Sequence, residues 1–330
     1  MLVLSRGDLE SVLAPADVIE ALEAALRLHG EGRAVVPPRS VAPVGDGVLL
    51  LMPAAWRPSG ADAEEPDGLG AKVVTYFAGN RARGQPTIHA TYLLMDGTTG
   101  QPLALLEGTF LTALRTGAAS ALAARHLARP DAGRIVCFGA GVQAGFQLRC
   151  LAAVVPLAGV AVVGRDPLRA RQFAEAMGRE LDVPVEVARD ARAAVREADI
   201  VVCATTSSTP VLFGADLKPG AHVDAVGAFR PDAREVDTEV VRRARVVVDT
   251  YEGALGEAGD ILIPLREGAV SREHIAAELA ELVAGSRRGR GDAAEVTLFK
   301  SVGWALEDLA AARLAYGRAR ARGIGTEVRL

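Results

Sequence analysis

The sequence predicts an α/β fold in which a doubly wound, parallel-sheet domain is inserted into a second domain of mixed α+β structure. Through residues 113–295, short apolar runs alternate with alanine-rich helical segments, a pattern typical of a parallel sheet with helices on both faces. The run Ile200–Ala204 is apolar or small at every position, as in a strand that is buried on both faces. Residues 1–112 instead mix one helix with several strands, and residues 296–330 hold one further helix.

The elements predicted for residues 1–112 follow from the residue patterns of each segment. Val18, Leu22 and Leu26 recur at helical spacing within Pro15–His29, which predicts a helix there. The segment Arg57–Gly68 is rich in proline, glycine and acidic residues, and it predicts an exposed loop. Apolar and β-branched runs predict strands at Ser40–Pro43, Val48–Met52, Leu69–Tyr76, Ala90–Asp96 and Leu103–Glu107. The turn sequence DGTTGQP joins the last two of these strands as a hairpin.

The last helix is predicted at Ser301–Arg320. Because the alternating pattern of the sheet domain ends before residue 296, we expect this segment to pack on the first domain. The predicted domains are therefore residues 1–112 plus 296–330, and residues 113–295.

Composition excludes several classes of protein. The 330-residue chain is 24 % charged with a formal net charge of −4, and its basic residues are scattered, so neither a nucleic-acid footprint nor a basic membrane patch is expected. No uncharged apolar run reaches the roughly 18 residues of a membrane-spanning helix, and the early charges Arg6 and Asp8 exclude a signal peptide. The three cysteines lack the spacing of a metal site. We expect a soluble, cytoplasmic protein without a bound metal.

A glycine-rich turn points to a dinucleotide. The sequence from Arg134 to Ala144, RIVCFGAGVQA, reads as a strand, a turn and the start of a helix. In this motif Gly139 makes the tight turn, Gly141 lets the backbone approach a pyrophosphate, and Ala144 lets the helix pack closely on the strand. The amino end of the helix offers free N–H groups to the phosphates. The sequence therefore predicts a Rossmann-type NAD(P)-binding domain.

The end of the second strand of this domain bears on which dinucleotide binds. NAD-dependent enzymes place an acidic residue there to bind the ribose 2′-hydroxyl, whereas this chain has Gly164 followed by Arg165. A small residue followed by arginine favours NADP(H), with NAD(H) as the alternative. Asp166 keeps that alternative open, since it takes the acidic role if the strand is one residue longer. Otherwise it caps the next helix ahead of Pro167.

Hydroxyl groups follow the fourth strand of the same domain, at Thr205, Thr206 and Ser207. Ligands of doubly wound folds bind at the carboxyl ends of the strands, so these three residues are candidates for the cofactor cleft. A plain serine- and threonine-rich turn is the alternative interpretation. Asp232 and Glu235, further along the chain, are expected to act as loop caps.

The chain resembles the ornithine cyclodeaminase/μ-crystallin family along nearly its whole length. The runs that carry the resemblance are LGAKVVTYFAGN (69–80), GQPTIHATYLLMDGTTGQPLALLEG (84–108), LTALRTGAASALAARHLAR (111–129), GAGVQA (139–144), VGAFRPDAREVD (226–237) and SVGWALEDL (301–309). The resemblance implies a homodimer formed by the first domain, which also binds the substrate. It implies hydride transfer at a carbon that is bonded to nitrogen and lies beside a carboxylate.

The resemblance also assigns roles to single residues. Arg39 in VPPR resembles the arginine that binds the substrate carboxylate, and Lys72 in LGAK resembles the lysine beside the reacting centre. That ammonium could bind the carboxylate or supply a proton to the substrate nitrogen. Thr87 and Arg115 resemble residues near the nicotinamide and pyrophosphate. The matching segments extend the expected cofactor site to Thr116, Val142, Gln143, Val226, Ser301 and Gly303.

Two departures from the family pattern concern the substrate. Cyclodeaminases carry an acidic residue two positions before Met-Pro, where this chain has Leu50 before Met52, and an Asp after the Val-Gly run, where it has Phe229. An apolar pocket of Leu50, Met52 and Phe229 suits a compact or apolar substrate. The expected function is therefore reduction of a cyclic imine or α-imino acid, or oxidation of a small amino acid. The alternatives are a true ornithine or lysine cyclodeaminase with bound NAD and a non-catalytic, μ-crystallin-like binding protein.

Overall fold

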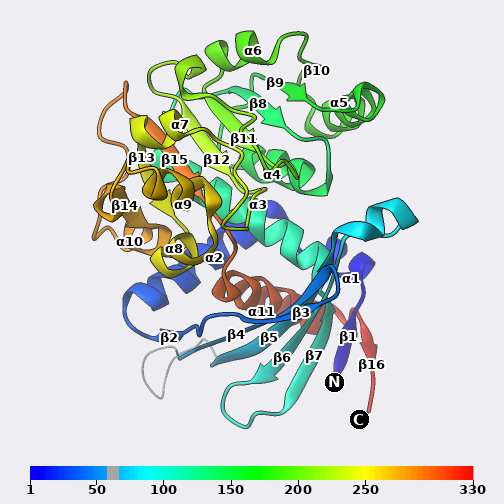
Figure 1. The fold of residues 1–330 in the computed structure, drawn as a ribbon. Helices are drawn as coiled ribbons and strands as arrows, with labels where there is room; N and C mark the ends of the chain where they lie inside the picture. The colour runs from blue at the N-terminus through cyan, green and yellow to red at the C-terminus, as the bar shows by residue number, and fades with distance from the viewer. Residues whose placement is uncertain (58–66, 330) are drawn as a thin grey trace. The chain divides into compact units, whose positions relative to one another are not determined.

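The computed structural model describes residues 1–57 and 67–329 of the chain. They form two compact units, Met1–Arg115 with Trp304–Leu330, and Thr116–Gly303 (Figure 1). The loop predicted at 57–68 falls almost entirely on residues 58–66, which lie outside the described residues.

The first unit is built on one largely antiparallel sheet. Its strands run in the order β16-β1-β7-β6-β5-β4-β2, with β3 paired to β4, and only the β1–β7 pair is parallel. The strands are β1 (Leu2–Leu4), β2 (Ala34–Val35), β3 (Ser40–Val44), β4 (Gly47–Trp56), β5 (Gly68–Phe77), β6 (Ile88–Asp96), β7 (Pro102–Glu107) and β16 (Thr326–Glu327). The helical segments are α1 (Arg6–Val12), α2 (Pro15–Gly30), η1 (Ala78–Arg83), the start of α3 (Gly108–Leu127) and α11 (Ala305–Arg322).

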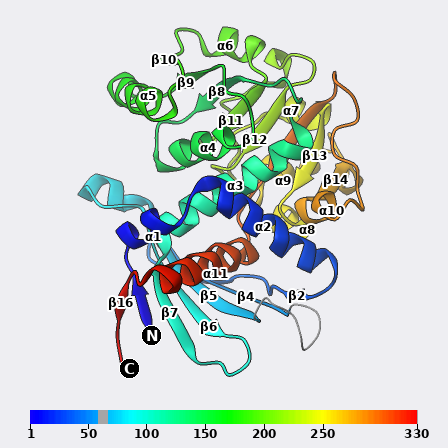
Figure 2. The same cartoon turned by 180° about the vertical axis from the view of Figure 1, so that it is seen from behind.

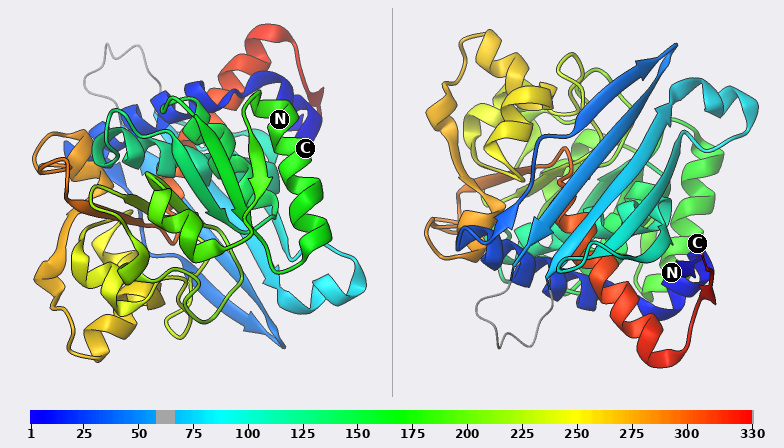
Figure 3. Two further views of the ribbon diagram at one scale, coloured as in Figure 1. Left: turned by 90° about the horizontal axis from the view of Figure 1, so that it is seen from above. Right: turned by 90° about the horizontal axis from the view of Figure 1, so that it is seen from below.

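The two faces of this sheet differ. Helix α11 packs against α2 and against β4, β5 and β6, and alternate residues of these strands, such as Met52 and Tyr92, are buried. The other residues of the same strands remain open, including Leu51 and Val73, which are 39 % and 42 % exposed. Strands β3–β7 lie side by side in Figure 3. The sheet therefore has a covered face and an apolar face that no described residue of this unit covers.

The second unit is a parallel, doubly wound sheet, as predicted (Figure 2). Its strand order is β10-β9-β8-β11-β12-β15-β13-β14. The strands are β8 (Arg134–Phe138), β9 (Gly159–Val163), β10 (Val185–Val187), β11 (Ile200–Cys203), β12 (His222–Ala225), β13 (Ala244–Val248), β14 (Ile275–Glu278) and β15 (Val296–Lys300). Its helices, besides the rest of α3, are α4 (Val142–Ala152), α5 (Pro167–Leu181), α6 (Ala191–Glu197), η2 (Gly214–Asp216), α7 (Thr238–Arg243), α8 (Tyr251–Glu257), α9 (Gly259–Arg266), η3 (Arg272–His274) and α10 (Leu279–Val283).

Strand β15 corrects the sequence interpretation, which placed residue 296 onward with the first domain. Val296–Lys300 lies between β12 and β13 in the second sheet and is buried at every position. Both neighbouring strands pair with it in parallel, so the sheet is complete only after residue 300. The final helix accordingly begins at Ala305 rather than at Ser301.

Candidate active site

Lys72 lies in the middle of a row of side chains that crosses the covered face of the first sheet. On β5 it pairs with Met52 of β4 and with Tyr92 of β6. Directly paired residues of antiparallel strands share a face, and α11 packs over this one. Lys72 is only 1 % exposed, so its ammonium needs partners of opposite charge.

Two carboxylates at the start of α11 supply these partners. Lys72 Nζ lies 2.7 Å from Asp308 Oδ2 and donates a hydrogen bond of 2.9 Å to Asp308 Oδ1. Arg115, from α3, binds the same Asp308 Oδ1 through Nε at 2.9 Å and Glu307 Oε2 through Nη1 at 2.6 Å. All four side chains are at most 4 % exposed. The result is a buried cluster of two cations and two carboxylates.

This environment makes Lys72 easier to deprotonate than an ordinary lysine. The pKa of Lys72 is lowered from 10.5 to about 8, because burial and then the nearby Arg115 charge lower it by more than Asp308 and Glu307 raise it. For Arg115, burial disfavours the charge, but Asp308 and Glu307 outweigh it and raise the pKa. Lys72 can therefore act as a proton donor near neutral pH while Arg115 stays charged.

Tyr92 is a polar residue of this row that the sequence interpretation missed. Its hydroxyl is fully buried and has no hydrogen-bond partner among the described residues. Burial, and then the charge of Asp308, raise its pKa well above 10. The ring lies over Gly70, where a β-carbon would collide with the tyrosine hydroxyl. The sequence signal was a glycine and a tyrosine on adjacent predicted strands, where the small residue leaves room for the ring.

Arg39 lies just outside the strands that carry this row. It directly precedes β3, whose first pair with β4 is Ser40 with Leu51, so the continued register sets Arg39 opposite Met52. Arg39 and Lys72 are then two strands apart, about 10 Å at the usual spacing. Leu50, two residues before Met52 on β4, shares this face. The fold thus brings Leu50, Met52 and Lys72 to one face of the sheet, and Arg39 directly precedes the strand beside them.

Two further residues predicted for the cofactor have main-chain bonds inside their own units. The carbonyl of Thr87, just before β6, accepts a hydrogen bond from Phe77 N at 2.9 Å. The carbonyl of Thr116, in α3, accepts from Gln147 Nε2 at 3.3 Å. Together with Arg115, whose Nε and Nη1 are engaged by Asp308 and Glu307, they stay predictions as cofactor ligands.

The glycine-rich turn of the second unit has the geometry that its sequence indicates. It follows β8 directly, and Gly139 has a φ of 115°, which favours glycine. A β-carbon at this position would collide with the carbonyl oxygen of Ala204. Gly141 is the N-cap of α4, and no side chain of the described residues caps that helix. Val142 and Gln143 form its first turn, so their N–H groups are placed to bind phosphate.

The end of β9 modifies the argument about the cofactor. A β-carbon on Gly164 would lie 2.8 Å from Ala170 Cβ in α5, so helix packing alone excludes a larger side chain there. Asp166 caps α5 and accepts from Leu168 N and Arg169 N at 3.0 and 3.2 Å. Arg165 is exposed. Arg169, one helical turn further and not foreseen, donates from Nε to Ala140 O of the glycine-rich turn at 3.1 Å.

The loops at the carboxyl ends of β11 and β12 hold further predicted residues. Thr205 Oγ1 donates to Glu235 Oε1 at 2.7 Å and accepts from Ser207 N at 3.1 Å, while Thr206 lies between them. Val226 N donates to Cys203 O at 3.0 Å. Glu235 therefore caps a loop, as expected.

Other predictions at this end of the sheet have mixed outcomes. Asp232 binds the exposed Arg230 instead of capping a loop. Beyond β15, Ser301 Oγ donates to Asp249 Oδ2 at 3.1 Å, and Asp249 Oδ2 also accepts from Gly303 N at 2.7 Å. These bonds shape the turn that leaves the second unit. Phe229 is half-buried in the loop after β12.

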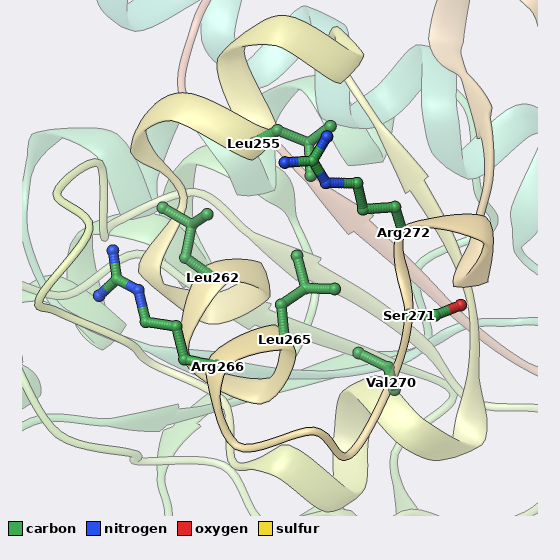
Figure 4. A pocket seen from close by; sticks show the side chains of 7 residues that line it. All are labelled: Leu255, Leu262, Leu265, Arg266, Val270, Ser271 and Arg272. Carbon is green, nitrogen blue, oxygen red and sulfur yellow. The ribbon is translucent and has the colours of Figure 1, made fainter.

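A surface cavity elsewhere in the second unit is unrelated to these residues. It has a volume of about 390 Å³ and is lined by the side chains in Figure 4, from α8, α9 and the segment that leads into the start of η3. It contains none of the predicted site residues. Among the described residues, no group of three or more histidine, cysteine or acidic side chains is arranged to hold a metal. No helix of the described residues has the length and apolar character to cross a membrane.

Comparison with known proteins shows the family and the fold of this chain. The family model described as "Ornithine cyclodeaminase/mu-crystallin family" matches residues 1–323. A Δ1-pyrroline-2-carboxylate reductase of Bacillus cereus is 37 % identical over 331 residues, covering 99 % of both chains. The structure of a Thermococcus litoralis Δ1-pyrroline-2-carboxylate reductase with NADH and L-proline is 44 % identical, with a TM-score of 0.95, covering 99 % of this chain and all of that one.

An archaeal alanine dehydrogenase dimer with bound NAD is 32 % identical, with a TM-score of 0.92 over 100 % of this chain and 99 % of that one. These proteins share a class, the nicotinamide-dependent oxidoreductases that act on bonds between carbon and nitrogen, and the predicted fold class is theirs. The chain belongs to the ornithine cyclodeaminase/mu-crystallin family. The predicted resemblance is thereby confirmed.

Proposed function

We propose that this protein is an NAD(P)H-dependent reductase of a cyclic imine or α-imino carboxylic acid, of the Δ1-pyrroline-2-carboxylate type. The observation that carries the proposal is the buried ammonium of Lys72, paired with Asp308 and lying two strands from the segment that holds Arg39. The full-length relatives act on, or are bound to, small cyclic amino or imino acids. A substrate of this class has one carboxylate and one basic nitrogen, which match one arginine and one proton donor.

The chemistry divides between the two units. When bound, NAD(P)H supplies a hydride to the imine carbon, and the electron pair of the C=N bond moves to nitrogen. In this proposal Lys72 gives its proton to that nitrogen, and Asp308 stabilises Lys72 in its charged form until it does so. Arg39 binds the substrate carboxylate through two parallel hydrogen bonds, a geometry that a guanidinium offers and an ammonium lacks.

For the cofactor, the proposal is a preference for NADPH over NADH. Arg165 follows β9 at the position where the adenine ribose binds in this fold. Arg169 adds a second guanidinium beside the glycine-rich turn. Asp166 has one carboxylate oxygen committed to capping α5, which disfavours its role as a ribose ligand. NADH in the Thermococcus litoralis relative keeps NAD(H) as the alternative.

We also propose a homodimer formed through the open face of the first sheet. Val44, Leu49, Leu51 and Val73 lie on this face and are between 36 % and 56 % exposed. An apolar sheet face of this kind is typical of a protein interface. An alanine dehydrogenase of the same fold is a dimer.

The test is a direct assay of the purified protein. With Δ1-pyrroline-2-carboxylate or the six-membered Δ1-piperideine-2-carboxylate, we expect oxidation of NADPH, followed by nicotinamide absorbance, and formation of proline or pipecolate. Pyruvate with ammonia tests the second candidate, an alanine dehydrogenase, which the archaeal relative supports. Turnover of neither imine would contradict the reductase proposal.

A further inference from the structure

Three loops meet at the carboxyl edge of the second sheet, where ligands of this fold bind. A β-carbon on Gly139, after β8, would collide with Ala204 O, after β11. A β-carbon on Gly227, after β12, would collide with Thr205 and would lie 2.5 Å from Glu235 Oε1. The loops are therefore in backbone contact, and a shift in one displaces the others.

A single carboxylate accepts hydrogen bonds from main-chain and side-chain donors of two of these loops. Glu235 Oε1 accepts from Thr205 N at 2.6 Å and from Thr205 Oγ1 at 2.7 Å. Its Oε2 accepts from Gly227 N at 2.6 Å and from Ala228 N at 3.2 Å. Glu235 is fully buried, so without it these donors would lose their partners. The shape of both loops depends on this side chain.

Two more buried charges hold Glu235 in place. Asp260 Oδ1 accepts from the main-chain nitrogens of Glu235 at 2.7 Å and Val236 at 3.0 Å. Lys300 Nζ, at the end of β15, lies 2.8 Å from Asp260 Oδ2 and donates to Ala228 O. Glu235, Asp260 and Lys300 are all 0 % exposed. Buried ion pairs contribute little net stability compared with apolar side chains of similar size, which favours a role in positioning.

We propose that Glu235, supported by Asp260 and Lys300, is a positioning residue for the dinucleotide. It holds the loops after β11 and β12 in the one conformation that binds NAD(P)H, without touching the cofactor itself. Thr205 then acts through the loop, since its hydroxyl donates to Glu235 and accepts from Ser207 N. This inference rests on the proposed function, in which this edge binds the nicotinamide cofactor.

The decisive variant is Glu235→Gln. The amide group turns an –NH2 toward N–H or O–H donors, so at least one loop loses its acceptor. Binding of NADH without substrate, followed by fluorescence, is expected to weaken about 10- to 100-fold, the range for losing hydrogen bonds to a charged group. The KM for the imine at saturating NADH is expected to change less than roughly threefold, because the residues that bind the imine are not altered.

A matched control lies at the opposite edge of the same sheet. Asp199, just before β11, accepts from Gly133 N and Arg134 N and pairs with Arg129 and Lys218. Asp199→Asn is expected to lower the melting temperature but to leave the Kd for NADH unchanged.

Thr205→Val serves as a milder second variant, since it removes one donor to Glu235 and the acceptor of Ser207 N while leaving the buried charges in place. It is expected to weaken NADH binding about 3- to 10-fold, in line with the loss of one such bond, and it decides the question if Glu235→Gln does not fold. Wild-type affinity in Glu235→Gln or, failing that, in Thr205→Val would overturn the positioning role. A wild-type protein that binds neither NADH nor NADPH would instead overturn the proposed function.

Discussion

Lys72 and Asp308 are 236 positions apart in the sequence, yet Nζ and Oδ2 lie 2.7 Å apart inside the first unit. Asp308 reaches this position because the chain returns after residue 303 to pack α11 on the sheet. The same carboxylate binds Arg115. One residue of the last helix thus pairs with both cations of the candidate site.

Replacing Asp308 is therefore expected to be costly. In Asp308→Asn the side chain keeps its size but loses its charge, which leaves the ammonium of Lys72 without an anion in direct contact. Breaking a buried pair in this way costs about 3–5 kcal/mol. The urea midpoint should fall accordingly, and it should fall further than in Glu307→Gln, which leaves Arg115 paired with Asp308. Equal losses in the two variants would contradict the double role of Asp308.

The pH dependence of imine reduction follows from the lowered pKa of Lys72. If Lys72 donates the proton, the active form of the free enzyme is the protonated one. Its population declines as pH rises through about 8, the lowered value. We expect kcat/KM for reduction to fall about tenfold per unit above that pH, and the reverse oxidation to rise over the same range. The measurement is the pH profile of kcat/KM in both directions.

The control for this profile is Lys72→Met, which keeps the apolar stem and removes the ammonium. Its residual activity should lack the limb near pH 8. If wild-type kcat/KM stays level to pH 10, then Lys72 is not the donor and a water molecule or another group supplies the proton.

If Arg39 binds the substrate carboxylate through two parallel hydrogen bonds, as proposed, lysine cannot replace it. A charge-assisted hydrogen bond is worth about 1.5–3 kcal/mol, so each bond lost should lower kcat/KM about 10- to 100-fold. Arg39→Ala should lose both bonds, and Arg39→Lys should recover at most one. Steady-state kinetics with the imine would show this order, and wild-type kinetics in Arg39→Ala would mean that the carboxylate is bound elsewhere.

The proposed preference for NADPH rests on the two arginines that flank the start of α5. Arg165→Ala and Arg169→Ala should each lower kcat/KM with NADPH about 10-fold or more, the value of one charge-assisted bond, and change it little with NADH. Arg171, exposed on the same helix, provides the matched control, because Arg171→Ala should leave the ratio unchanged. A wild-type preference for NADH would refute the assignment and return the ribose contact to Asp166.

How much of this site the sequence could predict depends on the range of the contacts. The turn at Gly139 and Gly141 depends on residues next to each other, and its strand–turn–helix context was readable directly. Lys72 stood out because a charged residue interrupts an apolar strand. Its partner Asp308 could not be deduced, since nothing local ties α11 to β5. Gly164 shows the opposite error, because contact with Ala170 explains that glycine without any reference to a cofactor.

Strand β15 illustrates the same limit in the fold. Its sequence, Val296–Lys300, was readable as a largely apolar run. Its place in the sheet, between β12 and β13, does not follow the order of the strands along the chain. The short strands β1 and β16 pair with distant segments, so they carry no local pattern of turn and strand. Elements that form hairpins or alternate with helices were predicted close to their observed bounds.

Leu50 and Phe229 occupy the two positions where the cyclodeaminase pattern has acidic residues. Leu50 lies on the sheet face of Lys72 and Met52, and it pairs with Val74. Phe229 is half-buried in the loop after β12. Ornithine brings a second ammonium, and burying it without a partner costs several kcal/mol. A substrate whose ring is already closed avoids this cost.

The last prediction is that the protein does not cyclise ornithine efficiently. Ring closure needs a neutral distal amine, so a base must first remove its proton, and two candidate carboxylates are engaged by other groups. Glu107 accepts from Thr109 N and Phe110 N at the start of α3, and Asp232 binds Arg230. With ornithine and NAD⁺, proline and ammonia should form at least about 100-fold more slowly than the imine is reduced, since an unpaired buried charge costs 3 kcal/mol or more. Leu50→Glu should narrow this gap by supplying an anion on the face of Lys72. Rapid formation of proline by the wild type would refute the argument and would mean that an acid such as Asp46 reaches the distal amine.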